Sequence, residues 1–144
     1  MPNIRHSIAI GALPELIYSL IASGHGFGQW WASDVTEDPA TGKVEIGFFN
    51  RATVYCLQPV RSAQPGSVEW LCQSGQEWNG TRLLSELTHG HGRSLLRFTH
   101  SDWQAETEYF ISCNTVWGEL MFRLKAAAEG KRPGPLFSGT GMAY

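Results

Sequence analysis

The feature that most constrains the fold is a series of five strand-like segments between residues 44 and 100. Each segment tends to alternate apolar with polar residues and is rich in Val, Thr, Tyr, Phe and Trp, which favour β-strands. The segments span residues 44–49, 53–61, 67–73, 79–88 and 93–100. Gaps of only a few residues separate them, whereas a parallel pair of strands needs a crossover of about a dozen residues or more. The sequence therefore predicts an antiparallel meander of hairpins.

Three shorter elements are expected before this meander. Residues 3–10 alternate in polarity, as in a first strand. Residues 13–21 have apolar positions at helical spacing, with Pro14 in the first turn, where proline is tolerated. The glycine-rich stretch 23–32 is expected to form a loop and one helical turn that directs its aromatic side chains inward.

A long helix is predicted after the last strand, from the capping residues Ser101 and Asp102 to about Glu129. Gly130 and the proline-containing segment after it end the helix. Its inward face is expected to consist of apolar residues at helical spacing, namely Phe110, Cys113, Trp117, Leu120, Met121, Leu124 and Ala128.

The order of elements predicts the α+β class. A curved six-stranded antiparallel sheet wrapped around the long C-terminal helix, with two short helices after the first strand, buries the apolar faces of all of them. The chain has 144 residues, 42% of them hydrophobic, which is enough for one core but not for two. We therefore expect a single domain at residues 1–137 and a flexible C-terminal tail at residues 138–144.

Charge and composition exclude several classes of protein. Eleven basic and thirteen acidic residues give a net charge of −2, which argues against binding to nucleic acid or to an anionic membrane. No apolar run is long enough to span a bilayer, and the N-terminus lacks the pattern of a signal peptide. Three cysteines without framework spacing favour a reducing, cytoplasmic location.

Motifs for cofactors are not found in the sequence. It contains no glycine-rich phosphate loop, no nucleophile elbow and no cluster with metal-ligand spacing. We therefore expect no cofactor and no metal, and no motif supports an enzyme. His89 and His91 could supply two metal ligands, but an exposed hairpin turn is the favoured interpretation of this pair.

Five short motifs, in their order and spacing, resemble the SRPBCC superfamily, whose members are also called START-like or helix-grip proteins. More narrowly, the chain is similar to the group named after the activator of heat-shock protein 90 ATPase. The resemblance covers roughly residues 3–137, and its motifs are Ala12-Leu13-Pro14-Glu15, Gly26-Phe27-Gly28-Gln29-Trp30-Trp31, Trp78-Asn79-Gly80-Thr81-Arg82, Leu96-Arg97-Phe98-Thr99-His100-Ser101-Asp102-Trp103, and Ser112-Cys113-Asn114-Thr115-Val116-Trp117 with Leu120.

The resemblance implies a helix-grip fold with a hollow between the curved sheet and the long helix, lined by apolar and aromatic side chains. It implies no single reaction, because members include lipid carriers, hormone and pigment binders, polyketide cyclases and co-chaperone domains. The leading hypothesis is a cytoplasmic domain that binds a small hydrophobic or aromatic molecule, such as a lipid, in this hollow.

Two alternatives stay open. One is a co-chaperone-like interaction domain with a chaperone as its partner. The other is a polyketide cyclase/dehydratase-like enzyme that uses His100 with Ser101 or Tyr18. Self-association as a homodimer is a further option, through Pro135, Leu136, Phe137 and the C-terminal tail.

The chain contains six tryptophans, and most of them fall on predicted inward positions. Such residues either fill the core or line a pocket for a planar apolar ligand, with indole N–H groups as donors. The ligand-binding residues predicted on the second interpretation are Trp30, Trp31, Trp70, Trp78, Phe98, His100, Trp103, Phe110, Cys113, Trp117, Leu120 and Met121.

His100 ends the last strand on the same face as Leu96 and Phe98. It either reaches a ligand from the rim of the hollow or bonds nearby backbone and holds the turn that follows, and the second role is favoured. Cys113 is expected to be a small buried hydrophobe rather than a thiol activated by His100. His6, on the inward face of the first strand, is expected to be a hydrogen-bonded core histidine.

Charged residues of the meander are expected on its outer face. Arg82, Glu86 and Arg97 are predicted to pair across neighbouring strands, which adds little stability in water. Glu45 and Glu69 are expected to lie on the same solvated face.

Overall fold

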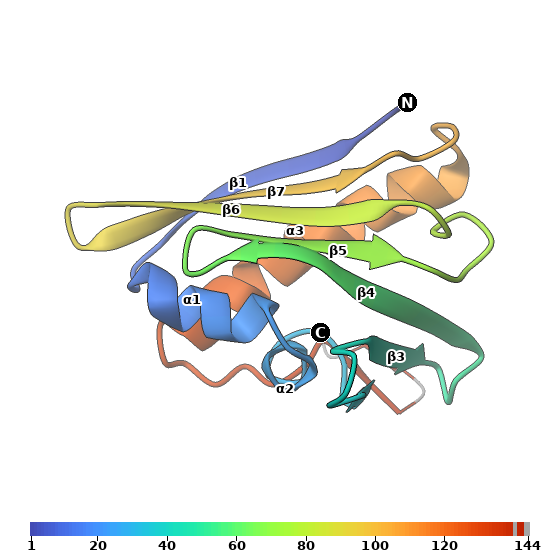
Figure 1. The fold of residues 1–144 in the computed structure, drawn as a ribbon, viewed down its shortest axis with the longest axis horizontal. Coiled ribbons are helices and arrows are strands. Elements are labelled where there is room, and N and C mark those ends of the chain that lie inside the picture. The colour runs from blue at the N-terminus through green and yellow to red at the C-terminus, as the bar shows by residue number, and fades with distance from the viewer. Residues whose placement is uncertain (140, 143–144) are drawn as a thin grey trace.

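The computed structural model describes residues 1–139, 141 and 142. A large antiparallel sheet covers one side of the long C-terminal helix, and two short helices follow the first strand (Figure 1). In chain order the elements are β1 (Ile4–Ile10), α1 (Pro14–Ile21), α2 (Gly24–Phe27), β2 (Asp34–Glu37), β3 (Val44–Phe48), β4 (Thr53–Ala63), β5 (Ser67–Cys72), β6 (Arg82–Gly90), β7 (Arg93–Ser101), α3 (Glu108–Ala128), β8 (Phe137–Ser138) and β9 (Gly141–Met142).

The main sheet has the strand order β1-β7-β6-β5-β4-β3-β2, and all its neighbouring strands are antiparallel. The strands from β3 to β7 form the predicted meander, and β1 joins it beside β7. In Figure 1, β4 bends away from β5 toward β3, so that the far end of the sheet curls toward the side on which α3 lies. The predicted α+β class, the antiparallel sheet and the long C-terminal helix are confirmed.

The prediction of six strands in this sheet is wrong, because β2 adds a seventh. Val35 of β2 lies opposite Ile46 of β3, and a turn joins the two strands through a hydrogen bond from Asp38 N to Lys43 O of 2.9 Å. The strand has only four residues and is mostly polar. Such a short edge strand carries too little alternation to be recognised from its sequence.

Helix α3 begins at Glu108, six residues after the end of the predicted Ser101-Asp102 cap. Thr107 is the N-cap, and its hydroxyl accepts a hydrogen bond from Phe110 N at 3.2 Å. Asp102 instead has a positive φ of 69° and turns the chain so that the Trp103 side chain enters the core. The inward face of α3 is confirmed, because its buried residues are the seven predicted ones.

Helices α1 and α2 pack tightly beside the sheet. A Cβ atom at Gly26 of α2 would lie 2.3 Å from Ser19 O, so only glycine allows this approach to α1. Trp30 Nε1 donates to Leu20 O at 2.8 Å, and Trp70 Nε1 donates to Ile21 O at 3.0 Å. These two indoles bind carbonyl groups at the C-terminal end of α1, which the helix itself leaves unpaired.

The outer face of the sheet carries one buried carboxylate. Glu69 is only 7% exposed, because Arg61 and Arg82 cover it at 3.0 Å and 2.6 Å. The expectation that Glu69 is solvated is therefore wrong. Burial opposes ionisation, but the two arginines outweigh it and lower the pKa of Glu69. Glu86 lies opposite Arg97 in the strand register, as expected for a cross-strand pair.

The C-terminal segment runs back along the molecule toward β3 (Figure 1). Leu136 N and Phe137 N donate to Trp30 O and Trp31 O at 3.1 and 2.9 Å, and β8 pairs with β9. Leu136 is fully buried, so this part of the predicted self-association surface packs within its own chain. The predicted flexible tail includes residues 140, 143 and 144, which lie outside the described residues.

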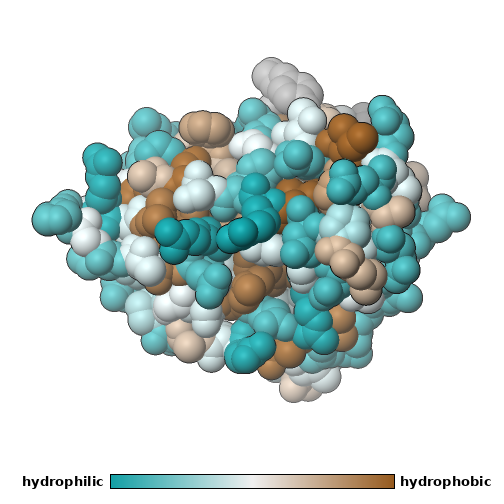
Figure 2. All heavy atoms as spheres, turned by 90° about the horizontal axis from the view of Figure 1, so that it is seen from above, coloured by the Kyte–Doolittle hydropathy of each residue, from teal (hydrophilic) through white to brown (hydrophobic). Residues whose placement is uncertain are grey.

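In the part of the chain that the structure describes, no helix combines the length and hydropathy needed to cross a membrane. The face shown in Figure 2 is largely hydrophilic, and its hydrophobic side chains are exposed in separate groups.

Candidate ligand pocket

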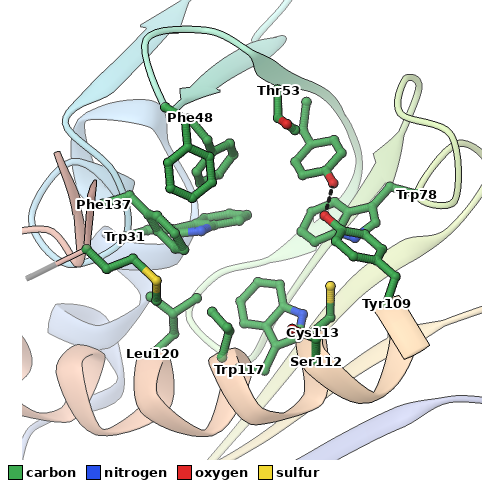
Figure 3. Close-up of a pocket in the computed structure, with 14 residues that line it drawn as sticks. Trp31, Phe48, Thr53, Trp78, Tyr109, Ser112, Cys113, Trp117, Leu120 and Phe137 are labelled. Atoms are coloured by element: carbon green, nitrogen blue, oxygen red, sulfur yellow. Dashed lines mark hydrogen bonds between the residues drawn. The ribbon is translucent and has the colours of Figure 1, made fainter. Parts of the chain in front are cut away.

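A cavity of about 260 Å³ lies between α3, the curled end of the sheet at β3 and β4, and the C-terminal segment (Figure 3). Its walls are mostly aromatic and aliphatic. It opens to the surface beside Phe49 and Tyr109, which are 45% and 40% exposed. The lining residues are Trp31, Phe48, Phe49, Thr53, Tyr55, Trp78, Tyr109, Ser112, Cys113, Val116, Trp117, Leu120, Phe137 and Met142.

Stacked and edge-on rings hold the walls of this pocket in place. The Trp31 ring packs 5.1 Å from that of Trp117 on α3, measured between centroids. Tyr55 stacks on Trp78 with ring centroids 3.9 Å apart and planes inclined by 4°. Gly75, with φ of +92°, passes against Tyr55, where a Cβ atom would lie 2.6 Å from Cε1. The pocket therefore has preformed flat aromatic walls.

The polar groups of the pocket gather at one end. The hydroxyl groups of Tyr55 and Tyr109 form a hydrogen bond, drawn as a dashed line in Figure 3. The thiol of Cys113 lies beside them, and the Trp78 indole N–H meets no oxygen or nitrogen acceptor within the described residues. Burial raises the pKa of Tyr55, of Cys113 and, to about 12, of Tyr109. All three side chains are therefore uncharged near neutral pH.

The predicted site residues separate into three groups. Trp31, Trp78, Cys113, Trp117 and Leu120 line the pocket. Trp30, Trp70, Phe98 and Met121 border a second, narrow cavity of about 20 Å³ on the other side of Trp31 and Trp117. His100, Trp103 and Phe110 border neither of these cavities and are buried in the core. Trp78 lies in the connection from β5 to β6.

The remaining lining residues were not predicted. On α3, Tyr109 lies four residues before Cys113, and Val116 lies three residues after it. Both therefore widen the inward face of the helix on one side. This spacing was a signal that could have identified them. Phe137 and Met142 come from the C-terminal hairpin, whose two-residue strands have no recognisable sequence pattern.

His100 is fully buried and is bound through both ring nitrogens. Trp117 Nε1 donates to Nδ1 at 3.0 Å, so the proton of the neutral ring is on Nε2, which donates to Thr81 Oγ1 at 2.8 Å. Thr81 Oγ1 in turn donates to Trp78 O at 2.6 Å. Burial lowers the pKa of His100 to about 3. The expectation that the His100 ring bonds nearby backbone is wrong, because its partners are the side chains of Trp117 and Thr81.

The other candidate groups are not brought together. His100 bonds Trp117 and Thr81 rather than Cys113. His91 lies in the β6–β7 turn with a φ of 56°. Among the residues with described positions, no three His, Cys, Asp or Glu side chains group as metal ligands. His6 Nε2 is buried without a hydrogen-bond partner in the described structure, contrary to expectation.

Comparison with solved structures identifies the fold. The Aha1 dimer from Colwellia psychrerythraea matches 92% of this chain and 99% of its own, with 28% identity and a TM-score of 0.76. MLL2253 from Mesorhizobium loti matches 89% and 97% of the two chains, with 13% identity and a TM-score of 0.76. CalU16 from Micromonospora echinospora matches 92% and 68%, with 14% identity and a TM-score of 0.73.

No protein-family model and no curated protein sequence matches the chain. The structural similarities are consistent with the helix-grip fold that the sequence motifs implied. The pairs with less than 25% identity establish the fold alone.

Proposed function

We propose that the protein binds a small apolar or aromatic molecule in the pocket between α3 and the curled end of the sheet. The observation that carries this proposal is the preformed cavity of about 260 Å³ with flat aromatic walls. Apolar pockets with a few grouped polar atoms are the usual form of small-molecule sites.

The size of the cavity limits the ligand. An apolar cavity of roughly 150 Å³ in a protein core takes up benzene. A space of about 260 Å³ therefore accommodates a molecule of about two fused rings against the aromatic walls. Burial of such a ligand removes apolar surface from water on both partners, which drives binding.

A pair of matched variants on α3 tests the proposal. Val116 lines the pocket and is half-buried, so Phe at this position fills part of the cavity. Ile111 is 51% exposed on the same helix and does not line the pocket. We expect Val116→Phe to weaken binding of the neutral two-ring dye prodan by roughly tenfold or more, and Ile111→Phe to leave it unchanged.

Fluorescence titration of the dye measures both affinities, and circular dichroism shows that both variants remain folded. Equal dye affinity in the wild type and in Val116→Phe would remove the pocket as the binding site.

A second candidate is a co-chaperone-like interaction domain. It is supported by the 28% identity to the Aha1 structure over most of both chains. Phe122 of α3 is 66% exposed and offers an apolar contact on the outside of the molecule. Capture of a purified heat-shock protein 90 chaperone on immobilised protein would support it, and no retention at micromolar concentration would reject it.

A further inference from the structure

Another hollow, separate from the narrow cavity beside Trp30 and Trp70, adjoins the pocket at its polar end. It measures about 480 Å³, and its walls include Thr53, Tyr55, Gly75, Glu77 and Tyr109. Thr53, Tyr55 and Tyr109 line both spaces. The hydrogen-bonded tyrosine pair therefore stands at the boundary between an apolar inner pocket and a polar outer hollow.

The tyrosine pair can bind a polar group that arrives at this boundary. One hydroxyl donates to the other, so the second hydroxyl hydrogen and further lone pairs of the two oxygens stay available to a ligand. Tyr109 is 40% exposed on the first turn of α3 and can yield space, whereas Tyr55 is clamped between Trp78 and Gly75.

Electrostatics at the boundary disfavours an anion. Among the described residues that line the two spaces, none is Lys, Arg or His. The carboxylate of Glu77 lies in the outer hollow and accepts a hydrogen bond from Thr107 Oγ1 at 2.5 Å. Glu77 therefore already occupies the N-terminal end of α3, where a ligand carboxylate would otherwise be stabilised.

We propose that the inner pocket and the outer hollow form one amphipathic site that selects an aromatic ligand with an uncharged hydrogen-bonding group, such as a phenol hydroxyl, and rejects a carboxylate. The ring system fills the inner pocket, and its polar group meets the hydroxyls of Tyr55 and Tyr109. This inference rests on the proposed function and specifies its ligand class.

Three probes with one ring system and different polar groups test the inference: 2-methylnaphthalene, 2-naphthol and 2-naphthoate, each used at pH 7 to displace the two-ring dye prodan from the wild-type protein. We expect 2-naphthol to bind about three- to tenfold more tightly than 2-methylnaphthalene, which is the usual gain from one hydrogen bond. We expect 2-naphthoate to bind more weakly than both.

Variants at Tyr109 and Glu77 test whether these two residues cause the preference for 2-naphthol and the rejection of 2-naphthoate. Tyr109→Phe removes one hydroxyl, and we expect it to abolish most of the preference for 2-naphthol without changing the affinity for 2-methylnaphthalene. Glu77→Gln keeps a group that can accept from Thr107, and we expect it to strengthen 2-naphthoate binding severalfold. Glu106→Gln, at an exposed carboxylate that lines neither space, is the matched control and leaves all three affinities unchanged.

The outcomes separate this inference from the proposed function. If none of the three probes displaces the dye, the proposed function fails. If all three displace it with equal affinity, or if 2-naphthoate binds best, the pocket stands and the selection by Tyr109 and Glu77 is overturned.

Discussion

At the scale of single residues, the buried histidine His100 shows how a polar group is held in an aromatic core. Its neutral ring accepts a hydrogen bond from the Trp117 indole and donates one to the Thr81 hydroxyl. Every polar side-chain atom of these three residues therefore has a hydrogen-bond partner. A protonated ring would lose the bond from Trp117, because Nδ1 would then carry a hydrogen. The charged form is also poorly solvated at this depth.

This arrangement makes the stability depend on pH. The pKa of His100 falls from 6.5 in the unfolded chain to about 3 in the folded protein. Between these values the unfolded state binds a proton that the folded state does not bind, so stability is complete above pH 6.5 and is lost as pH falls toward 3. The free energy of unfolding should fall by up to about 1.4 kcal/mol per pH unit through this group.

Urea unfolding between pH 7 and 4 measures this dependence. His100→Gln keeps one donor and one acceptor but does not titrate, so its slope should be smaller by up to one proton. Identical slopes in the wild type and the variant would contradict this account, because they would mean that the pKa of His100 does not change on folding.

The inward direction of His100 could be predicted, because Leu96, Phe98 and His100 alternate along one strand and all three are buried. The hydrogen-bond partners of His100 could not be predicted. Thr81 precedes the start of β6, and its position depends on the turn at Gly80, where φ is +89°.

At the scale of elements, α3 shows which part of a helix its own sequence determines. The 3.6-residue period of apolar side chains fixes the inward face, and that prediction is confirmed. The N-terminus depends on which of several candidate caps has helical residues after it. Ser101 still belongs to β7, and Asp102 turns the chain into the loop with Trp103, so Thr107 is the first residue free to cap.

Removal of this cap should destabilise the protein. Thr107→Ala loses the bond from Phe110 N and the bond to Glu77, and we expect a cost of about 1 kcal/mol in the free energy of unfolding. Thr115→Ala, at an exposed position in the middle of the same helix, is the control and should not destabilise the protein, because alanine has the higher helix propensity. Equal effects in denaturant unfolding would contradict the capping role.

At the scale of the whole molecule, the pocket lies between α3 and the curled end of the sheet at β3 and β4. The sequence predicted an aromatic hollow against the helix, and five of the predicted residues line the pocket. It did not predict that Trp30, Trp70, Phe98 and Trp103 pack together with their neighbours closely enough to fill the space under the central strands. Side-chain packing in three dimensions decides this, and no periodicity along the chain encodes it.

The six tryptophans offer a direct test of where a ligand binds, because each indole N–H gives its own signal in a nitrogen–hydrogen correlation spectrum. Three of them line the pocket and three do not, namely Trp31, Trp78 and Trp117 against Trp30, Trp70 and Trp103. Titration with 2-naphthol should shift the signals of the first three most strongly, through the ring current of the bound probe. No shift in any indole signal, or shifts largest for the other three, would contradict a ligand site in this pocket.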